Sequence, residues 1–288
     1  MFQSDLLQGK VILITGGGTG LGRAMGERFL SLGARLAIAG RREEVLRAAA
    51  AEMSATGGEV LTVPCDVRDP ARVAAMADAV WSRYGRLDVL VNNAAGNFAA
   101  PTETLSHRAV DAVLNIVLHG TFYCTLEVGK RWLDAGAGGV MLNIVTTYAA
   151  SGSGSAYVVP SAAAKAGVLA LTRSLAVEWG PRGIRQVAIA PGPFPTPGAW
   201  GRLVPSAANN QRAEDGVPLG RFGEHGELAN LATFLISDYA GYINGEVVTI
   251  DGGEWLQGAG EFSKLRSLRP EQWAEMAHQA RSADKPKP

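Results

Sequence analysis

The stretch TGGGTGLG, Thr15 to Gly22, follows the apolar run KVILI and leads directly into an amphipathic segment. A glycine-rich turn between a strand and a helix lets the backbone approach a pyrophosphate, and the free N–H groups at the helix start can bind that anion. A sharp turn without a ligand has the same local sequence. After the first strand of an alternating chain, however, the turn predicts dinucleotide binding. The candidate residues are Thr15, Gly16, Gly18, Thr19, Gly20, Leu21 and Gly22.

The rest of the chain alternates short aliphatic runs with longer amphipathic segments. Near-continuous Val, Ile and Leu runs suit parallel strands that are covered on both faces. The alternation predicts a doubly wound Rossmann-type α/β fold as a single domain over residues 1–257, followed by a C-terminal extension, 258–288, that is helical and then disordered. The predicted strands are Lys10–Thr15, Arg35–Ala39, Glu59–Pro64, Val89–Asn92, Gly139–Val145, Arg185–Ala190 and Val247–Ile250. The predicted helices include Gly20–Leu32, Glu43–Thr56, Pro70–Tyr84, Ser161–Gly180 and Glu271–Arg281.

Composition narrows the class of protein. The 27 basic and 27 acidic side chains give a net charge of zero, so the overall field offers no general attraction to nucleic acid or to a membrane. The two cysteines, Cys65 and Cys124, lie far apart without metal-ligand spacing, which favours a reducing compartment and no metal site. The N-terminus shows no secretory signal, and the apolar runs are much shorter than the roughly 20 residues that span a bilayer. We expect a soluble cytoplasmic protein.

The predicted second strand ends in Gly40-Arg41-Arg42. At this position a carboxylate would bind the ribose 2′-hydroxyl of NAD, whereas an arginine accommodates the 2′-phosphate of NADP. No acid stands at the strand end, and the alternative is that the two arginines form a solvated loop pair. We therefore favour NADP(H) as the cofactor. The ends of the next two strands add Asp66 and Val67, for the adenine, and Asn93, Ala94, Ala95 and Gly96, for the ribose and nicotinamide.

These motifs, in this order, resemble the short-chain dehydrogenase/reductase family over nearly the whole chain. The segments that carry the resemblance are the glycine-rich turn, Asn92-Asn93-Ala94, Pro191-Gly192…Thr196 and Asp251-Gly252-Gly253. The resemblance implies a sheet of about seven parallel strands. It also implies that the stretch with Pro191, Gly192 and Phe194 binds cofactor and that Thr196 contacts the nicotinamide carboxamide.

The family chemistry needs a hydroxyl that hydrogen-bonds the substrate oxygen as negative charge develops, with a cation nearby. Most members place a serine after the fifth strand, then a tyrosine and a lysine one helical turn apart. Here Ser161 stands 4 residues before Lys165, and Tyr148 stands 13 residues before Ser161, directly after a predicted strand. The tyrosine and the serine are therefore exchanged, and both hydroxyls can still converge near Lys165.

The exchanged pattern is similar to that of the NADPH-dependent 2,4-dienoyl-CoA reductases. In that family, the residues at the positions of Tyr148 and Asn97 hydrogen-bond the thioester carbonyl, the match of Lys165 holds the nicotinamide ribose, and the match of Ser161 supports the site. The resemblance implies reduction of a 2,4-dienoyl-CoA to an enoyl-CoA in the β-oxidation of unsaturated fatty acids, by a homotetramer. The alternatives are a related enzyme acting on a ketone, a 3-oxoacyl or a trans-2-enoyl thioester, and a non-catalytic NADP-binding regulator.

Several residues near these motifs have less specific interpretations. Tyr157 lies eight residues before Lys165, outside the predicted helix, so we interpret it as an aromatic residue that lines a substrate pocket or packs under a loop. His119 stands where the resemblance implies asparagine, and we assign it no chemistry. The stretch 198–222, rich in glycine and proline, predicts a substrate lid. Its Arg202 and Arg212, with Arg221, are candidates for the phosphates of coenzyme A or for a solvated surface.

Overall fold

The computed structural model describes most of the chain. The described residues are 2–55, 57–149, 154–196, 211, 213–258, 265 and 268–283, with the backbone alone for 277–283. Most of the predicted lid and the predicted disordered end, Lys285–Pro288, lie outside these residues.

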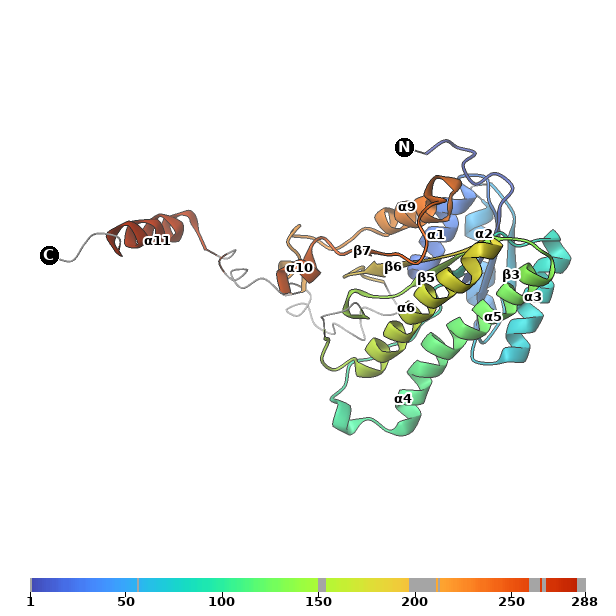
Figure 1. Ribbon diagram of the computed structural model, residues 1–288, viewed down its shortest axis with the longest axis horizontal. Helices are drawn as coiled ribbons and strands as arrows, with labels where there is room; N and C mark the ends of the chain where they lie inside the picture. The colour runs from blue at the N-terminus through green and yellow to red at the C-terminus, as the bar shows by residue number, and fades with distance from the viewer. Residues whose placement is uncertain are drawn as a thin grey trace.

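Seven strands form one parallel sheet in the order β3-β2-β1-β4-β5-β6-β7 (Figure 1). The direction of the strand order reverses between β1 and β4, and in such sheets a ligand crevice forms at the carboxyl ends of the strands beside this switch point. Asn92 of β4 pairs with Asn143 of β5, so these two strands end at nearly the same level. The strands are β1 (Val11–Thr15), β2 (Arg35–Gly40), β3 (Val60–Pro64), β4 (Val89–Asn92), β5 (Gly139–Ile144), β6 (Ile184–Pro191) and β7 (Val247–Ile250).

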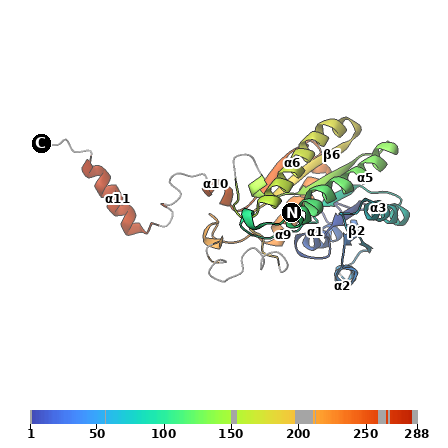
Figure 2. The same ribbon diagram turned by 90° about the horizontal axis from the view of Figure 1, so that it is seen from below.

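Helices cover both faces of the sheet (Figures 1 and 2). α1, α2 and α9 bury apolar residues such as Phe29 in the core of one face, and α3, α5 and α6 bury residues such as Trp132 in the core of the other. Because side chains alternate along a strand, Ile12 enters the first core and its neighbour Leu13 the second. The helices are α1 (Gly20–Leu30), α2 (Glu43–Ser54), α3 (Pro70–Tyr84), α4 (His107–Leu114), α5 (Gly120–Asp134), α6 (Val159–Trp179), α9 (His225–Ile236), α10 (Glu254–Gly258) and α11 (Pro270–Ala283).

The prediction of a doubly wound parallel α/β domain is confirmed, and its boundaries shift by a few residues. α1 ends at Leu30 rather than Leu32, because Gly33 adopts a φ of 89°, which a helix cannot continue. α6 begins at Val159, two residues before the predicted start, and Pro160 lies in its first turn, where a missing N–H costs nothing. α11 confirms the helix predicted in the extension, and its Trp273 is half exposed.

A long broken helix between β4 and β5 was not resolved by the sequence analysis. α4 and α5 are joined by a π-helical turn, η2 (Asn115–His119), into one segment over His107–Asp134. Its length and its mean hydropathy of 1.3 over the most apolar window would suffice to cross a membrane. In this fold, however, Cys124 and Trp132 of the segment pack in the core under the sheet, so we interpret it as a core helix.

Candidate active site

The glycine-rich turn connects β1 to α1 and packs against the loop after β4. Gly16 has a φ of 67°, in the left-handed region that favours glycine, and a β-carbon there would lie 3.1 Å from the Cα of Ala94. A β-carbon on Gly22 would lie 2.4 Å from the carbonyl oxygen of Gly16. Both positions therefore require glycine, and this requirement explains the motif in physical terms.

Thr15 and Asn93 hold this turn to the neighbouring strand. The buried Thr15 Oγ1 accepts hydrogen bonds from the backbone N–H of Asn93 (3.0 Å) and of Ala94 (3.1 Å). Asn93 Nδ2 in turn donates to the carbonyl oxygens of Thr15 (3.0 Å) and Gly16 (3.2 Å). These two predicted cofactor residues therefore fix the backbone of the turn and do not line the cleft. Leu21 likewise packs against the core.

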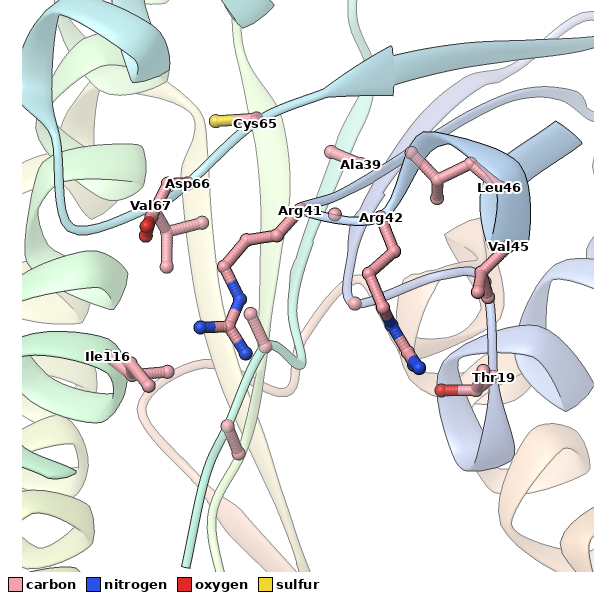
Figure 3. A pocket seen from close by; sticks show the side chains of 15 residues that line it. Thr19, Ala39, Arg41, Arg42, Val45, Leu46, Cys65, Asp66, Val67 and Ile116 are labelled. Carbon is pink, nitrogen blue, oxygen red and sulfur yellow. The ribbon is translucent and has the colours of Figure 1, made fainter. Parts of the chain in front are cut away.

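A cleft lies at the carboxyl ends of β1 to β4 (Figure 3). It holds about 730 Å³ of empty space, part of which is open to solvent. Arg41 and Arg42 extend into it from the end of β2, Arg41 toward Asp66 and Arg42 toward Thr19 (Figure 3). The predicted cofactor residues that line the cleft are Gly16, Gly18, Thr19, Arg41, Arg42, Asp66, Val67, Ala94 and Ala95.

The charges of the cleft leave Arg41 and Arg42 available to bind an anion. Asp66 is ion-paired with Arg68 at 2.5 Å, and the Arg68 guanidinium, with a smaller contribution from Arg41, holds the pKa of Asp66 below its usual value. No ion pair between described residues involves Arg41 or Arg42. A glycine-rich turn at a helix start and two guanidinium groups without an ion pair among the described residues suit the phosphates of a dinucleotide.

Asn97, Tyr148 and Ser161 form a chain of hydrogen bonds next to this cleft; we call them the donor cluster. Tyr148 lies in the short helix η3 (Thr147–Ala149) directly after β5, and its hydroxyl is 3.1 Å from Ser161 Oγ on α6. Asn97, from the loop after β4, donates through Nδ2 to the Tyr148 hydroxyl at 3.3 Å. The three residues that sequence spacing and resemblance selected are therefore in contact.

The amide of Asn97 is oriented by its own loop. Its Oδ1 accepts a hydrogen bond from the backbone N–H of Phe98 at 2.9 Å, which turns Nδ2 toward Tyr148. The Phe98 ring packs against a small apolar cluster that includes Val117 and Ala164, so η2 and α6 fix the position of the loop. The donor cluster is thus supported from three elements of the fold.

Lys165 lies one helical turn after Ser161 and is buried. Its ammonium donates a hydrogen bond to the carbonyl oxygen of Ile144, the last residue of β5. Burial lowers the pKa of Lys165 from 10.5 to about 8, because the charged form loses hydration. Lys165 therefore lies between the donor cluster and the end of β5, and burial of its charged ammonium costs hydration free energy.

The segment after β6 reaches back toward the glycine-rich turn. Thr196 lies beside Gly20, where a β-carbon would come 3.1 Å from its Cγ2. The Phe194 ring is buried in the core against Gly223, so the side chain of this predicted cofactor residue does not face the cleft. His225 Nε2 hydrogen-bonds the carbonyl oxygen of Pro195 at 2.8 Å and ties the segment to α9. The end of β6 is therefore held in place from α9.

Other residues that the sequence singled out lie elsewhere. His119 is exposed, and its Nδ1 is 2.8 Å from Asn115 Oδ1 within η2. Arg221 is ion-paired with Glu227 at 2.7 Å. Arg202 and Arg212 lie outside the described residues.

Some lining residues of the cleft were missed by sequence reasoning. Ile116 enters the cleft from the π-helical turn, for which the sequence carries no clear signal, whereas Cys65 could have been found because it directly precedes Asp66 at the end of β3. The residues concerned are Ala39, Gly40, Val45, Leu46, Cys65 and Ile116.

Comparison with known proteins identifies relatives of this chain. A family model described as Enoyl-(Acyl carrier protein) reductase matches residues 16–254. A Bacillus subtilis protein named Probable 2,4-dienoyl-CoA reductase, (2E)-enoyl-CoA-producing, is 46% identical over 87% of this chain and 98% of its own. A Caenorhabditis elegans protein named Probable 2,4-dienoyl-CoA reductase 3, (3E)-enoyl-CoA-producing, is 43% identical over 88% of this chain and 83% of its own.

Solved structures show the same fold. A short-chain dehydrogenase from Bacillus anthracis superposes with a TM-score of 0.78 at 46% identity, covering 85% of this chain and 96% of its own. A 3-ketoacyl-(acyl-carrier-protein) reductase from Brucella melitensis, complexed with NADH, gives 0.79 at 30% identity over 86% and 99%. The chain belongs to the short-chain dehydrogenase/reductase family, a family of oxidoreductases that use a nicotinamide cofactor.

Proposed function

We propose that this protein reduces 2,4-dienoyl-CoA thioesters to enoyl-CoA with NADPH, in the breakdown of unsaturated fatty acids. The observation that carries the proposal is the hydrogen-bonded chain from Asn97 through Tyr148 to Ser161. It places the Tyr148 phenol where most family members place a serine, with the amide N–H of Asn97 next to it. Two adjacent donors suit one developing oxyanion better than they suit the protonation of an alcohol oxygen.

The hydrogen bond from Asn97 has a fixed direction, whereas either hydroxyl can donate in the bond between Tyr148 and Ser161. Asn97 Nδ2 donates one hydrogen to the Tyr148 oxygen, and its second hydrogen remains for a substrate oxygen. If the Ser161 hydroxyl donates to Tyr148, the hydrogen of Tyr148 is also directed at the substrate. Ser161 then acts as a positioning residue, and Asn97 and Tyr148 are the two catalytic donors.

A nicotinamide cofactor bound in the cleft would supply a hydride to C5 of the dienoyl chain. The electron pair of the dienoyl system moves toward the thioester, and the carbonyl oxygen becomes a dienolate oxygen with negative charge. Tyr148 and Asn97 hydrogen-bond this oxygen, and preorganised donors of this kind each contribute about 10²- to 10³-fold to a rate. A proton from solvent then completes the enoyl product. Lys165 stabilises the negative charge electrostatically while its ammonium is protonated.

Preference for NADPH is part of the same proposal and is supported by the cleft. Arg41 and Arg42 extend into it, and its carboxylate, Asp66, is paired with Arg68. A 2′-phosphate carries about two negative charges, and each charge-assisted hydrogen bond to it contributes about 1.5–3 kcal/mol. A ribose 2′-hydroxyl without phosphate would leave two guanidinium groups without an anion.

The direct test follows NADPH oxidation with three substrates: a 2,4-dienoyl-CoA, a 3-oxoacyl-CoA and a trans-2-enoyl-CoA. We expect turnover of the dienoyl thioester alone. Because curated relatives at similar identity carry names with (2E) and with (3E) products, the double bond of the product should be located by NMR. Turnover of the 3-oxoacyl or trans-2-enoyl thioester alone supports the related reductase. Tight NADPH binding without turnover of any thioester supports a regulatory protein.

We also propose that the protein is a homotetramer and acts in the cytoplasm. The half-exposed Trp273 and Met276 of α11 are apolar side chains that a neighbouring subunit could cover. The measurement is light scattering of the purified full-length chain, together with a variant that ends at residue 269. A tetramer for the full chain and a smaller assembly for the shortened one are expected. A monomer in both cases would reject the assembly.

A further inference from the structure

Tyr157 has an unusual backbone conformation. Its φ is 67°, and it is the sole non-glycine residue with a positive φ in the part of the chain that the structure describes. This left-handed region is unfavourable for a residue with a β-carbon, whereas glycine adopts it without strain. Strained residues that persist in a folded protein tend to occur at ligand sites and switches. The presence of tyrosine rather than glycine at this turn therefore needs a reason.

The turn is fastened to the loop of the donor cluster. The carbonyl oxygen of Tyr157 accepts a hydrogen bond from the backbone N–H of Ala100 at 2.9 Å, and Ala100 follows Asn97 by three residues. On the other side, the buried Val158 caps the start of α6, which carries Ser161 one turn later. Tyr157 therefore stands at the rim of the donor cluster, and its position is fixed from two sides.

The ring of Tyr157 does not stabilise the fold through packing. It is 62% exposed, and its neighbour Val159 is 44% exposed. Within the described part of the chain, its hydroxyl has no hydrogen-bond partner. Two further apolar side chains, Leu219 and Leu256, are exposed at the same carboxyl edge of the sheet, near the end of β7. The edge around the site thus presents apolar surface that is exposed on these described residues.

We propose that Tyr157 is a specificity-determining residue whose ring packs against the acyl chain of the thioester substrate. The identity of the ligand rests on the proposed function; the placement of the ring does not. A neutral aromatic ring offers dispersion and apolar burial, which suit a hydrocarbon chain, and offers nothing to the phosphates of coenzyme A. The strained turn holds the Tyr157 ring beside the acyl chain, where that chain extends away from the donor cluster.

The test measures binding rather than turnover. Hexanoyl-CoA and decanoyl-CoA, which are saturated and cannot be reduced, are titrated into the protein with NADP⁺ in a calorimeter. For the unmodified protein, we expect the longer chain to bind more tightly. In Tyr157→Gly, decanoyl-CoA should bind about tenfold more weakly, at the low end of what burial of an aromatic side chain contributes, and hexanoyl-CoA should change less. Tyr157→Phe should behave like the unmodified protein.

The variants distinguish the effect of the Tyr157 ring from the effect of its backbone conformation. Glycine relieves the strain at this φ, so Tyr157→Gly should melt at the same temperature or higher, and Tyr157→Asn, which also tolerates the left-handed region, is a second ring-free variant. Tyr242→Ala removes a fully exposed tyrosine that lies near the opposite end of β7 and should leave both affinities unchanged.

Each outcome decides the proposal. Unchanged decanoyl-CoA binding in both ring-free variants overturns it, as does an equal loss for both chain lengths, which would place the ring against coenzyme A. Absence of acyl-CoA binding by the unmodified protein overturns this proposal and the proposed function together. A loss of affinity for decanoyl-CoA alone supports the proposal, whether or not dienoyl-CoA is reduced. If dienoyl-CoA is reduced but the variants bind both acyl-CoA ligands unchanged, the proposed function holds and the role of Tyr157 is rejected.

Discussion

The cofactor cleft and the donor cluster lie side by side at the carboxyl edge of one sheet, but they are built differently. The cleft is shaped by backbone: glycines pack where no β-carbon fits, and the segments that follow β1, β2, β3 and β4 supply its walls. The donor cluster consists of three side chains from three loops or helices, joined by two hydrogen bonds that both involve Tyr148. Loss of one side chain should therefore lower cofactor affinity only moderately when it lies in the cleft, and should lower the reaction rate strongly when it lies in the donor cluster.

The largest expected effect comes from removing the phenol of the donor cluster. Tyr148→Phe leaves the ring in place and deletes the hydroxyl that both Asn97 and Ser161 contact. We expect kcat for a dienoyl-CoA to fall about 10²- to 10³-fold, as for the loss of an oxyanion donor, with the Kd of NADPH unchanged. Stopped-flow NADPH oxidation and fluorescence titration measure the two quantities.

Tyr157→Phe is the matched control for that variant, because it deletes the hydroxyl of the other nearby tyrosine. It keeps the ring, so substrate binding and kcat should both stay close to those of the unmodified protein. If Tyr157→Phe lowers kcat more than Tyr148→Phe does, the assignment of the two tyrosines is reversed.

Lys165, between the two regions, should make stability depend on pH. Its pKa is 10.5 when unfolded and about 8 when buried, so between these values the unfolded chain binds the extra proton. The free energy of unfolding contributed by Lys165 therefore rises with pH across this window, by up to about 3 kcal/mol, and the cost of burial is fully present below the lower value.

The effect is measured by urea unfolding of the unmodified protein and of Lys165→Met at about pH 7 and about pH 10. The stability of the variant minus that of the unmodified protein should be larger at the lower pH. This comparison cancels other titrating groups, which are common to both proteins. A difference that stays constant between the two pH values contradicts a buried ammonium.

A smaller effect is expected from weakening the cleft. Arg42→Ala removes the guanidinium that points toward Thr19, and the KM for NADPH should rise about tenfold or more, since hydrogen bonds to a charged phosphate contribute about 1.5–3 kcal/mol. The KM for NADH and the kcat should change little. Arg47→Ala, in which an exposed arginine paired with Glu43 is lost, is the control. Equal losses with both cofactors argue against 2′-phosphate recognition.

The smallest effect is expected at His119, which lies outside both regions. Its ring is exposed and hydrogen-bonded to Asn115 within the π-helical turn. His119→Asn should change the free energy of unfolding by no more than about 0.5 kcal/mol, as for most surface substitutions, and should leave kcat within about twofold. Melting curves and steady-state kinetics measure both. A large fall in kcat would indicate that the π-helical turn contributes to the reaction.

Much of the fold was predictable from local pattern. The bounds of β4 and β7 agree with the predicted Val89–Asn92 and Val247–Ile250, because parallel strands in such a sheet form short aliphatic runs that end in turn residues. The exchange of Tyr148 and Ser161 was predictable too, since 13 and 4 are spacings along the chain. Boundaries were less certain where caps decide them, as at Gly33 and Pro160.

The sequence by itself determined the sheet, the glycine-rich turn and the residue types of the site, because strand periodicity, turn chemistry and helical spacing are local properties. Only the tertiary structure decided that Asn97 meets Tyr148, 51 residues away, that Phe194 faces the core, that Ile116 enters the cleft from a π-helical turn, and that Tyr157 is held in a left-handed conformation by Ala100. These features depend on contacts between segments that are distant in the chain, and such contacts exist only once the strands have paired and the helices have packed on them.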